Sequence, residues 1–168
     1  SKDILVGHFA DIDLQEALNA DYVVTYDTHQ AQRQEPAPLL SYLDSREPEY
    51  IVQIDGISYA SVYSMSTDIR DEPSYRQVDV VLEDLVSLEG YSVSPANPTA
   101  GQTLVVSLAW QALDAPHERL KVFVHLLNDD GRLVAQHDGE PLAWHSPTDR
   151  WEAGNRLTDR HGLVLPFD

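Results

Sequence analysis

The first half of the chain mixes helical and strand spacing of its apolar residues. Residues 21–26 form a β-branched and aromatic run that predicts a strand. Short helices are predicted before and after it, at 14–18 and 39–43, where apolar residues recur at helical spacing and aspartates or prolines precede them. An Asp-Gly pair at 55–56 lies between two apolar runs and predicts an antiparallel hairpin.

The second half follows a period of two from Val78 onward. Four residues alternate with their neighbours on a predicted strand and should be buried together: Leu104, Val106, Leu108 and Trp110. The sequence NDDG at 128–131 joins two further apolar runs as a tight hairpin. Short strands over about 90 residues are typical of an immunoglobulin-like sandwich. No strand signal follows LVLPFD at 163–168, so we expect the sandwich to lack its last strands.

The expected fold class is therefore α+β: a small αβ unit with an antiparallel hairpin, followed by an all-β immunoglobulin-like sandwich. A polar stretch at 66–77 that contains Pro73 separates the two patterns and predicts the boundary between them. We assign residues 1–68 to the mixed unit, 69–77 to a linker and 78–168 to the sandwich domain.

Acidic residues outnumber basic residues by 28 to 11, which gives a formal net charge of -17. No stretch gathers Lys or Arg into a stripe, so the charge pattern argues against nucleic acid and anionic lipid as partners. Cysteine is absent, which excludes disulfides, thiol catalysis and thiolate metal sites.

Motifs of the common enzyme classes are absent too: the sequence has no G-x-S-x-G elbow, Walker loop, H-E-x-x-H or G-x-G-x-x-G. A hydrolase built on scattered acids would be the remaining enzymatic alternative. Asp11 and Asp13 form a D-x-D pair, which holds a divalent metal in nucleotide-sugar transferases. The same residues suit the N-cap of a helix, and we assign no metal to them.

Histidines flank the predicted hairpin at 128–131. His125 and His137 lie at equal distances from Gly131, so direct pairing across the strands would put both on one face, beside Asp138. His145 and Asp149 lie farther along the chain. A protein-held transition metal needs at least three ligands on one face. Hydrogen-bonded strand histidines explain the pattern more simply, so we predict no metal and no cofactor.

The stretch from 141 to 166 concentrates aromatic and charged side chains. Trp144 and Trp151 have flat faces that stack on sugar rings, and His145 and Arg150 stand beside them to bind hydroxyl groups. The structural alternative is that SPTD starts a turn and Trp151 covers the edge of the core. We expect Trp151 to be buried and Trp144 exposed. The candidate ligand-binding residues are then Trp144, His145 and Arg150, with no catalytic candidate.

Two parts of the chain resemble a known family. Three runs, DYVVTY at 21–26, HQAQRQEPAPLLSYL at 29–43 and EPEYIVQIDGISYASVY at 47–63, are similar to the segment after the last membrane helix of certain bacterial membrane glycosyltransferases. These enzymes form the protein O-mannosyltransferase and aminoarabinose transferase superfamily. Residues 121–166 resemble a β-domain often appended to those tails, through the elements F-V-H-L, Q-x-D and P-T-x-x-W. Together the similar parts cover roughly residues 21–65 and 78–166.

This resemblance implies an extracytoplasmic accessory region of an enzyme that uses a polyprenyl-phosphate-linked sugar. It also implies a transmembrane domain upstream in the same chain as its first partner. The superfamily's catalytic acid lies in a loop between early membrane helices, which no part of this sequence matches. We therefore expect a non-catalytic region that aids recognition of glycan or acceptor protein. The alternative is a secreted carbohydrate-binding or protein-interaction module.

Overall fold

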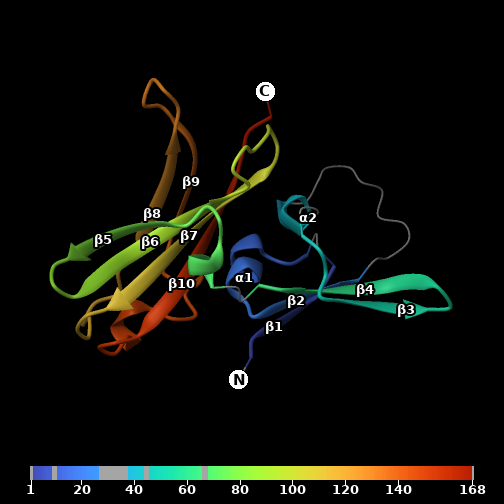
Figure 1. Cartoon of the computed structure of the whole chain (residues 1–168), viewed down its shortest axis with the longest axis horizontal. Coiled ribbons are helices and arrows are strands. Elements are labelled where there is room, and N and C mark those ends of the chain that lie inside the picture. The colour runs from blue at the N-terminus through green and yellow to red at the C-terminus, as the bar shows by residue number, and fades with distance from the viewer. Residues whose placement is uncertain (1, 9–10, 27–37, 44–45, 66–67, 168) are drawn as a thin grey trace. The chain divides into compact units, whose positions relative to one another are not determined.

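The computed structural model describes residues 2–8, 11–26, 38–43, 46–65 and 68–167. They belong to two compact units, Ser1–Thr67 and Asp68–Asp168 (Figure 1). The chain is α+β as predicted, with a small αβ unit that ends in an antiparallel hairpin, followed by an all-β sandwich.

The described residues of the first unit form a four-stranded sheet with two short helices. Its strands follow the order β1-β2-β4-β3, with bounds β1 (Ile4–Gly7), β2 (Tyr22–Tyr26), β3 (Tyr50–Ile54) and β4 (Ile57–Ser64). The helices are α1 (Leu14–Asn19) and α2 (Pro38–Leu43). β1 runs parallel to β2, and the other neighbouring strands are antiparallel. Both helices, the strand β2 and the hairpin are confirmed; residues 27–37, which include Pro36, lie outside the described residues.

Local sequence explains where two of these elements begin and turn. The Asp13 carboxylate accepts hydrogen bonds from the backbone N–H groups of Gln15 and Glu16, each at 3.0 Å, and so caps α1. Asp55 and Gly56 both have positive φ angles, 51° and 79°. Two consecutive residues with positive φ angles form a type I′ turn, and the twist of this turn matches the right-handed twist of the two strands that it joins.

The second unit has two antiparallel sheets. The larger follows the order β10-β7-β6-β5, with bounds β5 (Arg76–Leu82), β6 (Val86–Ser94), β7 (Thr103–Ala112) and β10 (Arg156–Val164). The smaller is the hairpin of β8 (Val122–Leu127) and β9 (Leu133–Gly139). Two short 3-10 helices complete it, η1 (Ile69–Asp71) and η2 (Thr148–Arg150). Between residues 100 and 165, all of them described, no longer helix occurs, as the period of two predicts.

The core of the sandwich lies between the β8–β9 hairpin and one face of the larger sheet, called here the inner face. Trp110 on β7 is 7% exposed and packs with Leu108 and the β8 residues Val122 and Val124. A second cluster joins Leu104 and Leu163 of the larger sheet to Leu126 and Ala135 of the hairpin. The burial predicted for Trp110 is confirmed.

The smaller sheet is too narrow to cover the larger one. The two strands of the smaller sheet face the four strands of the larger sheet, so the inner face remains uncovered along its edge strand β5. Val80 and Leu82 pair with the inner-facing Leu88 and Val86, yet they remain 46% and 48% exposed. The sandwich is therefore incomplete on its β5 side.

Residues 69–77, predicted as a linker, are folded into the second unit. Ile69 in η1 is fully buried, and β5 already begins at Arg76. The carboxylate of Glu72 accepts a hydrogen bond from the Ser92 hydroxyl of β6 at 2.5 Å. η1 contacts β7, and the Glu72–Ser92 hydrogen bond joins the segment to β6 on the face of the larger sheet opposite the hairpin, called the outer face.

Candidate functional site

Residues 141–151, called here the 141–151 loop, are part of the connection between β9 and β10 and carry the candidate ligand-binding residues. The loop starts with three consecutive positive φ angles, 54°, 49° and 64°, at Leu142, Ala143 and Trp144. Non-glycine residues adopt this region at an energetic cost, so contacts elsewhere must hold the turn. The backbone N–H of Leu142 donates to the buried carboxylate of Asp159 at 2.8 Å, which provides one such contact.

The outer side of this turn presents two aromatic rings to solvent. Trp144 is 56% exposed, and its ring lies nearly parallel to that of His145, with 6.0 Å between ring centroids and 20° between planes. Arg150 is exposed at the end of η2. The structure thus brings Trp144 and His145 together, but shows no hydrogen bond or ion pair from the Arg150 guanidinium to any described residue.

The inner side of the same loop is packed and hydrogen-bonded. Trp151 is 3% exposed, and its indole N–H donates to the carbonyl oxygen of Ser146 at 2.9 Å. The buried Thr148 hydroxyl donates to the carbonyl of Glu118 at 2.6 Å and accepts from the N–H of Leu120 at 2.8 Å. The expected contrast between a buried Trp151 and an exposed Trp144 is confirmed.

A buried polar array lies directly behind the turn. His161 and Asp159 of β10 are 0% and 1% exposed, and the His161 Nε2 lies 2.7 Å from an Asp159 carboxylate oxygen. On its other side the His161 Nδ1 lies 2.7 Å from Nδ1 of His137 on β9. With the proton of neutral His161 on Nε2, His161 donates to Asp159 and accepts from His137. The array therefore links β9, β10 and the Leu142 N–H in one chain of hydrogen bonds.

His125 and His137 do not pair directly, which corrects the expectation from their spacing. His125 is opposite Gln136, and His137 is opposite Val124. The expected pairing fails because the hairpin turn is centred on Asp130 and not on Gly131, and the irregularity next to Leu127 offsets only part of this difference. A shift of one residue moves a side chain to the other face of a strand. His125 therefore faces solvent and contacts Asp138 at 3.1 Å, whereas His137 faces His161.

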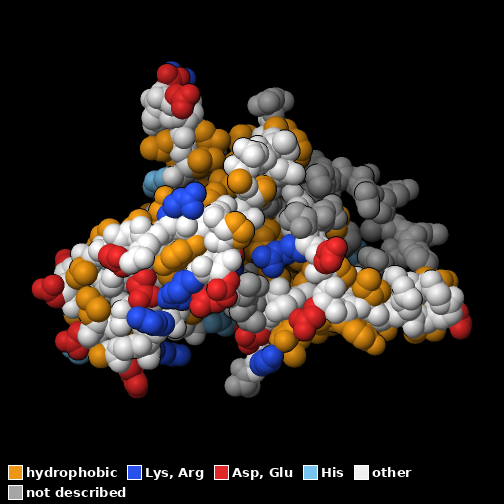
Figure 2. Space-filling model, viewed as in Figure 1, with side chains coloured by type: hydrophobic (Ala, Val, Ile, Leu, Met, Phe, Trp, Pro, Cys, Tyr) orange, Lys and Arg blue, Asp and Glu red, His pale blue; other side chains and the backbone are white. Residues whose placement is uncertain are grey.

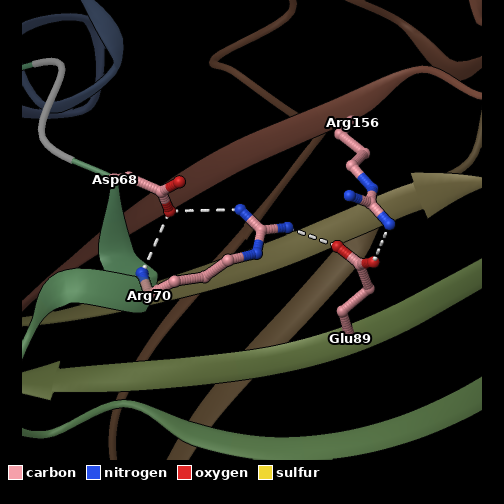
Figure 3. Close-up of polar contacts among 4 residues, drawn as sticks. All are labelled: Asp68, Arg70, Glu89 and Arg156. Atoms are coloured by element: carbon pink, nitrogen blue, oxygen red, sulfur yellow. Dashed lines mark hydrogen bonds and ion pairs between the residues drawn. The ribbon is translucent and has the colours of Figure 1, made fainter.

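A chain of ion pairs crosses the outer face of the larger sheet (Figure 3). The Glu89 carboxylate of β6 binds Arg70 of η1 on one side and Arg156 of β10 on the other, the latter at 3.1 Å. Arg70 also contacts Asp68 at 3.1 Å. Side chains of both charge signs are interspersed over this face (Figure 2).

These ion pairs shift the ionisation of their members. A hydrogen bond from the Arg70 backbone N–H, helped by its guanidinium, lowers the pKa of Asp68 below its usual value despite partial burial. Burial favours neutral Arg70, but hydrogen bonds from its guanidinium to Glu89 and Asp68 outweigh it and raise the pKa of Arg70. Each charge in the chain has an opposite partner, so we interpret it as a clamp that holds η1 on the sheet.

The D-x-D pair has a structural role at one of its two positions. Asp13 caps α1 through one carboxylate oxygen, as described above, and Asp11 is exposed just before the helix. Among the described residues, no group of three or more His, Asp or Glu side chains is arranged to hold a metal ion.

Comparison of the chain with models of protein families, with curated proteins and with solved structures gives no match. Within the described part of the chain, no helix is long and apolar enough to cross a membrane. Interpretation of the function therefore depends on the geometry of the second unit and on the sequence resemblance given above.

Sequence patterns identified the exposed face of the 141–151 loop but not the array that holds it. Asp159 and His161 lie two residues apart on β10, in the sequence TDRH at 158–161, and so point to the same face of a strand. That spacing was the available signal. Their contact with His137 could not be predicted from the sequence, because it depends on how two separate sheets pack.

Proposed function

We propose that this chain is a non-catalytic recognition region for glycan, the extracytoplasmic accessory part of a membrane glycosyltransferase that uses a polyprenyl-phosphate-linked sugar. The observation that carries the recognition role is the exposed, nearly parallel pair of rings of Trp144 and His145. These rings lie on a turn that is held by a hydrogen bond to the buried Asp159 carboxylate. The link to the glycosyltransferase is supported by the resemblance at residues 21–65 and 78–166.

Trp144 suits sugar binding in its chemistry. An indole face is large, flat and apolar, and the axial C–H groups of a pyranose ring present a matching apolar surface. His145 supplies ring nitrogens that donate to and accept from hydroxyl groups. The guanidinium of Arg150, which is on the same loop, adds further donors.

Preorganisation supports the same role. A binding loop that orders only on contact with its ligand loses affinity to the entropy of ordering. The 141–151 loop is held by Asp159, Thr148 and the Trp151 indole through hydrogen bonds of 2.6–2.9 Å. Its exposed rings are therefore in place before any ligand arrives.

Calorimetric titration with neutral tetrasaccharides, including mannotetraose and chitotetraose, tests the recognition role. We expect saturable binding of at least one sugar, and Trp144→Ala should weaken it by about tenfold or more, because aromatic contacts contribute on the order of 1 kcal/mol beyond area burial. Phe167→Ala, which removes an aromatic ring that is 68% exposed elsewhere in the same unit, should leave affinity unchanged. Equal losses in both variants would refute the site.

The origin of the chain is tested by the gene sequence upstream of residue 1. A series of apolar runs of about 20 residues, as membrane helices require, supports the glycosyltransferase assignment. A signal peptide directly upstream would instead identify a secreted module and overturn it.

A further inference from the structure

The two histidines of the buried polar array join the β8–β9 hairpin to the larger sheet. His137 on β9 is half-buried and His161 on β10 is fully buried, with 5.0 Å between ring centroids and 2.7 Å between the two Nδ1 atoms. The residues opposite them on the neighbouring strands are apolar, Val124 on β8 and Val106 on β7. A contact that can take up protons therefore lies in the apolar interface between the two sheets.

The geometry limits how many protons the two rings can carry together. One proton lies on His161 Nε2, which donates to the buried Asp159 carboxylate at 2.7 Å. Only one proton fits between the two Nδ1 atoms, because two N–H groups directed at each other across 2.7 Å repel. The fourth ring nitrogen, Nε2 of His137, can carry at most one more. The folded pair therefore holds no more than three ring protons, whereas two fully protonated imidazoles carry four.

We propose that the His137–His161 pair is a pH-sensitive latch, which holds the β8–β9 hairpin on the larger sheet near neutral pH and releases it when both rings are protonated. Two neutral rings, or two rings with one extra proton, keep both hydrogen bonds of the pair. A second extra proton places two cationic N–H donors against each other, so the half-buried His137 turns toward solvent. The latch is a property of the fold and does not depend on the proposed function.

Asp159 is the counter-charge of the pair. Its carboxylate is buried, contacts His161 and accepts from the Leu142 N–H, and the residues opposite Asp159 and His161 on β7 are apolar. The other charged and titratable groups of the neighbouring elements have partners of their own: His125 with Asp138 on the solvent side of the hairpin, Glu140 with Arg119 after β9, and Arg160 near Asp68 on the outer face. One negative charge balances one extra proton on the pair, but not two.

Proton linkage gives the latch a measurable size. Imidazoles in an unfolded chain have a pKa of about 6.5, so below about pH 6 the unfolded chain binds both extra protons while the folded pair binds at most one. Because the unfolded state binds more protons, stability falls as pH falls. A difference of one proton raises the unfolding constant about tenfold for each pH unit between about pH 6 and about pH 5.

Urea denaturation between about pH 5 and about pH 7.5, with His137→Asn beside the parent, tests the proposal. The asparagine amide reaches the position of Nδ1 and donates to His161, and its carbonyl accepts from a protonated His161, but the amide does not titrate. The parent's unfolding constant should rise about tenfold per pH unit relative to that of the variant. His117→Asn, which removes an exposed histidine elsewhere in the unit, should keep the parent's slope.

NMR of the ring nitrogens in the unaltered chain gives a second measurement, which does not need the variant to fold. At about pH 8 we expect His161 to be protonated at Nε2 and not at Nδ1, and His137 to be protonated at Nδ1. At about pH 5 the NOEs between the two rings, and those between Leu126 and Leu163 across the sheets, should weaken. NOEs between Val86 and Trp110, which both belong to the larger sheet, should persist.

Three results would overturn the latch. One is an equal pH slope for the parent and His137→Asn. Another is a loss of the slope in His117→Asn as well, since that would assign it to histidines in general. The third is a folded chain at about pH 5 in which all four ring nitrogens carry protons and the NOE between the two rings persists.

Discussion

The outer and inner sides of the 141–151 loop differ in almost every physical respect. The outer side exposes Trp144 and His145, whose rings contact each other. The inner side buries Trp151 and Thr148, each with hydrogen-bond partners inside the unit. The two sides of this short segment therefore have different roles. Its inner side closes the core, and its outer side offers a surface that the fold itself does not need.

This difference teaches how to separate binding from stability in one loop. Substitutions on the inner side should destabilise the unit, and substitutions on the outer side should change only recognition. Asp159 stands between them, because it belongs to the core but its carboxylate fixes the turn that carries Trp144.

The largest contrast is expected between the two tryptophans. Trp151→Ala removes a buried ring and should lower the free energy of unfolding by about 3–5 kcal/mol. Trp144→Ala removes a ring that is 56% exposed and should change it by no more than about 0.5 kcal/mol. Urea denaturation of both variants measures the difference. Equal and large losses would show that Trp144 is part of the core.

The next effect should come from Asp159, which joins the two sides. Asp159→Ala leaves the Leu142 N–H and His161 Nε2 without their partner, and should cost about 3 kcal/mol, since each buried orphan costs about 1–3 kcal/mol. In the folded fraction, exchange of the Leu142 amide should become faster. Retained protection of that amide would show that the turn is held by something else.

A smaller loss is expected at Thr148. Thr148→Val keeps the side-chain shape but removes the hydroxyl that joins Glu118 and Leu120, at a cost of about 1–2 kcal/mol. Thr158→Val, a matched change at a half-buried position of β10, serves as the control. If the two variants melt at the same temperature, the Thr148 hydrogen bonds do not stabilise the inner side.

The smallest effect concerns acid stability and lies outside the loop. The pKa of Asp68 is lowered in the folded chain, so its contribution to stability is present above its unfolded pKa of about 3.9 and is lost as pH falls through the folded value. Asp68→Asn should therefore reduce stability at pH 7 by less than about 1 kcal/mol, because the side chain is half exposed. As pH falls through the folded pKa of Asp68, the variant and the parent should converge. A difference that grows on acidification would contradict the sign.

Features set by a few adjacent residues could be predicted from the sequence. The Asp55-Gly56 turn, the N-cap at Asp13 and the hairpin at 128–131 each depend on local backbone preference. In the last of these, the Asn128 side chain accepts from the N–H groups of Asp130 and Arg132, and Gly131 has a φ of 75°. Neighbouring residues determine such contacts, so a pattern in the sequence is sufficient.

Features set by distant packing could not. β1 is a four-residue run whose role depends on parallel pairing with β2 across a helix, and no alternation marks it. The pairing of His137 depended on where the hairpin turn is centred, which is Asp130 and not Gly131, and the sequence spacing did not reveal this. The polar stretch around Ile69 belongs to the sandwich through contacts with β6, the Glu72–Ser92 hydrogen bond among them, which no local pattern indicates.

The indole N–H signals of the three tryptophans test the central claim most directly. We predict that a tetrasaccharide that binds the chain shifts the Trp144 signal in a saturable way and leaves the Trp110 and Trp151 signals unchanged. Trp144 is the exposed ring of the three, and the other two are 7% and 3% exposed. A glycan that shifts the Trp110 or Trp151 signal while that of Trp144 stays in place would contradict the account.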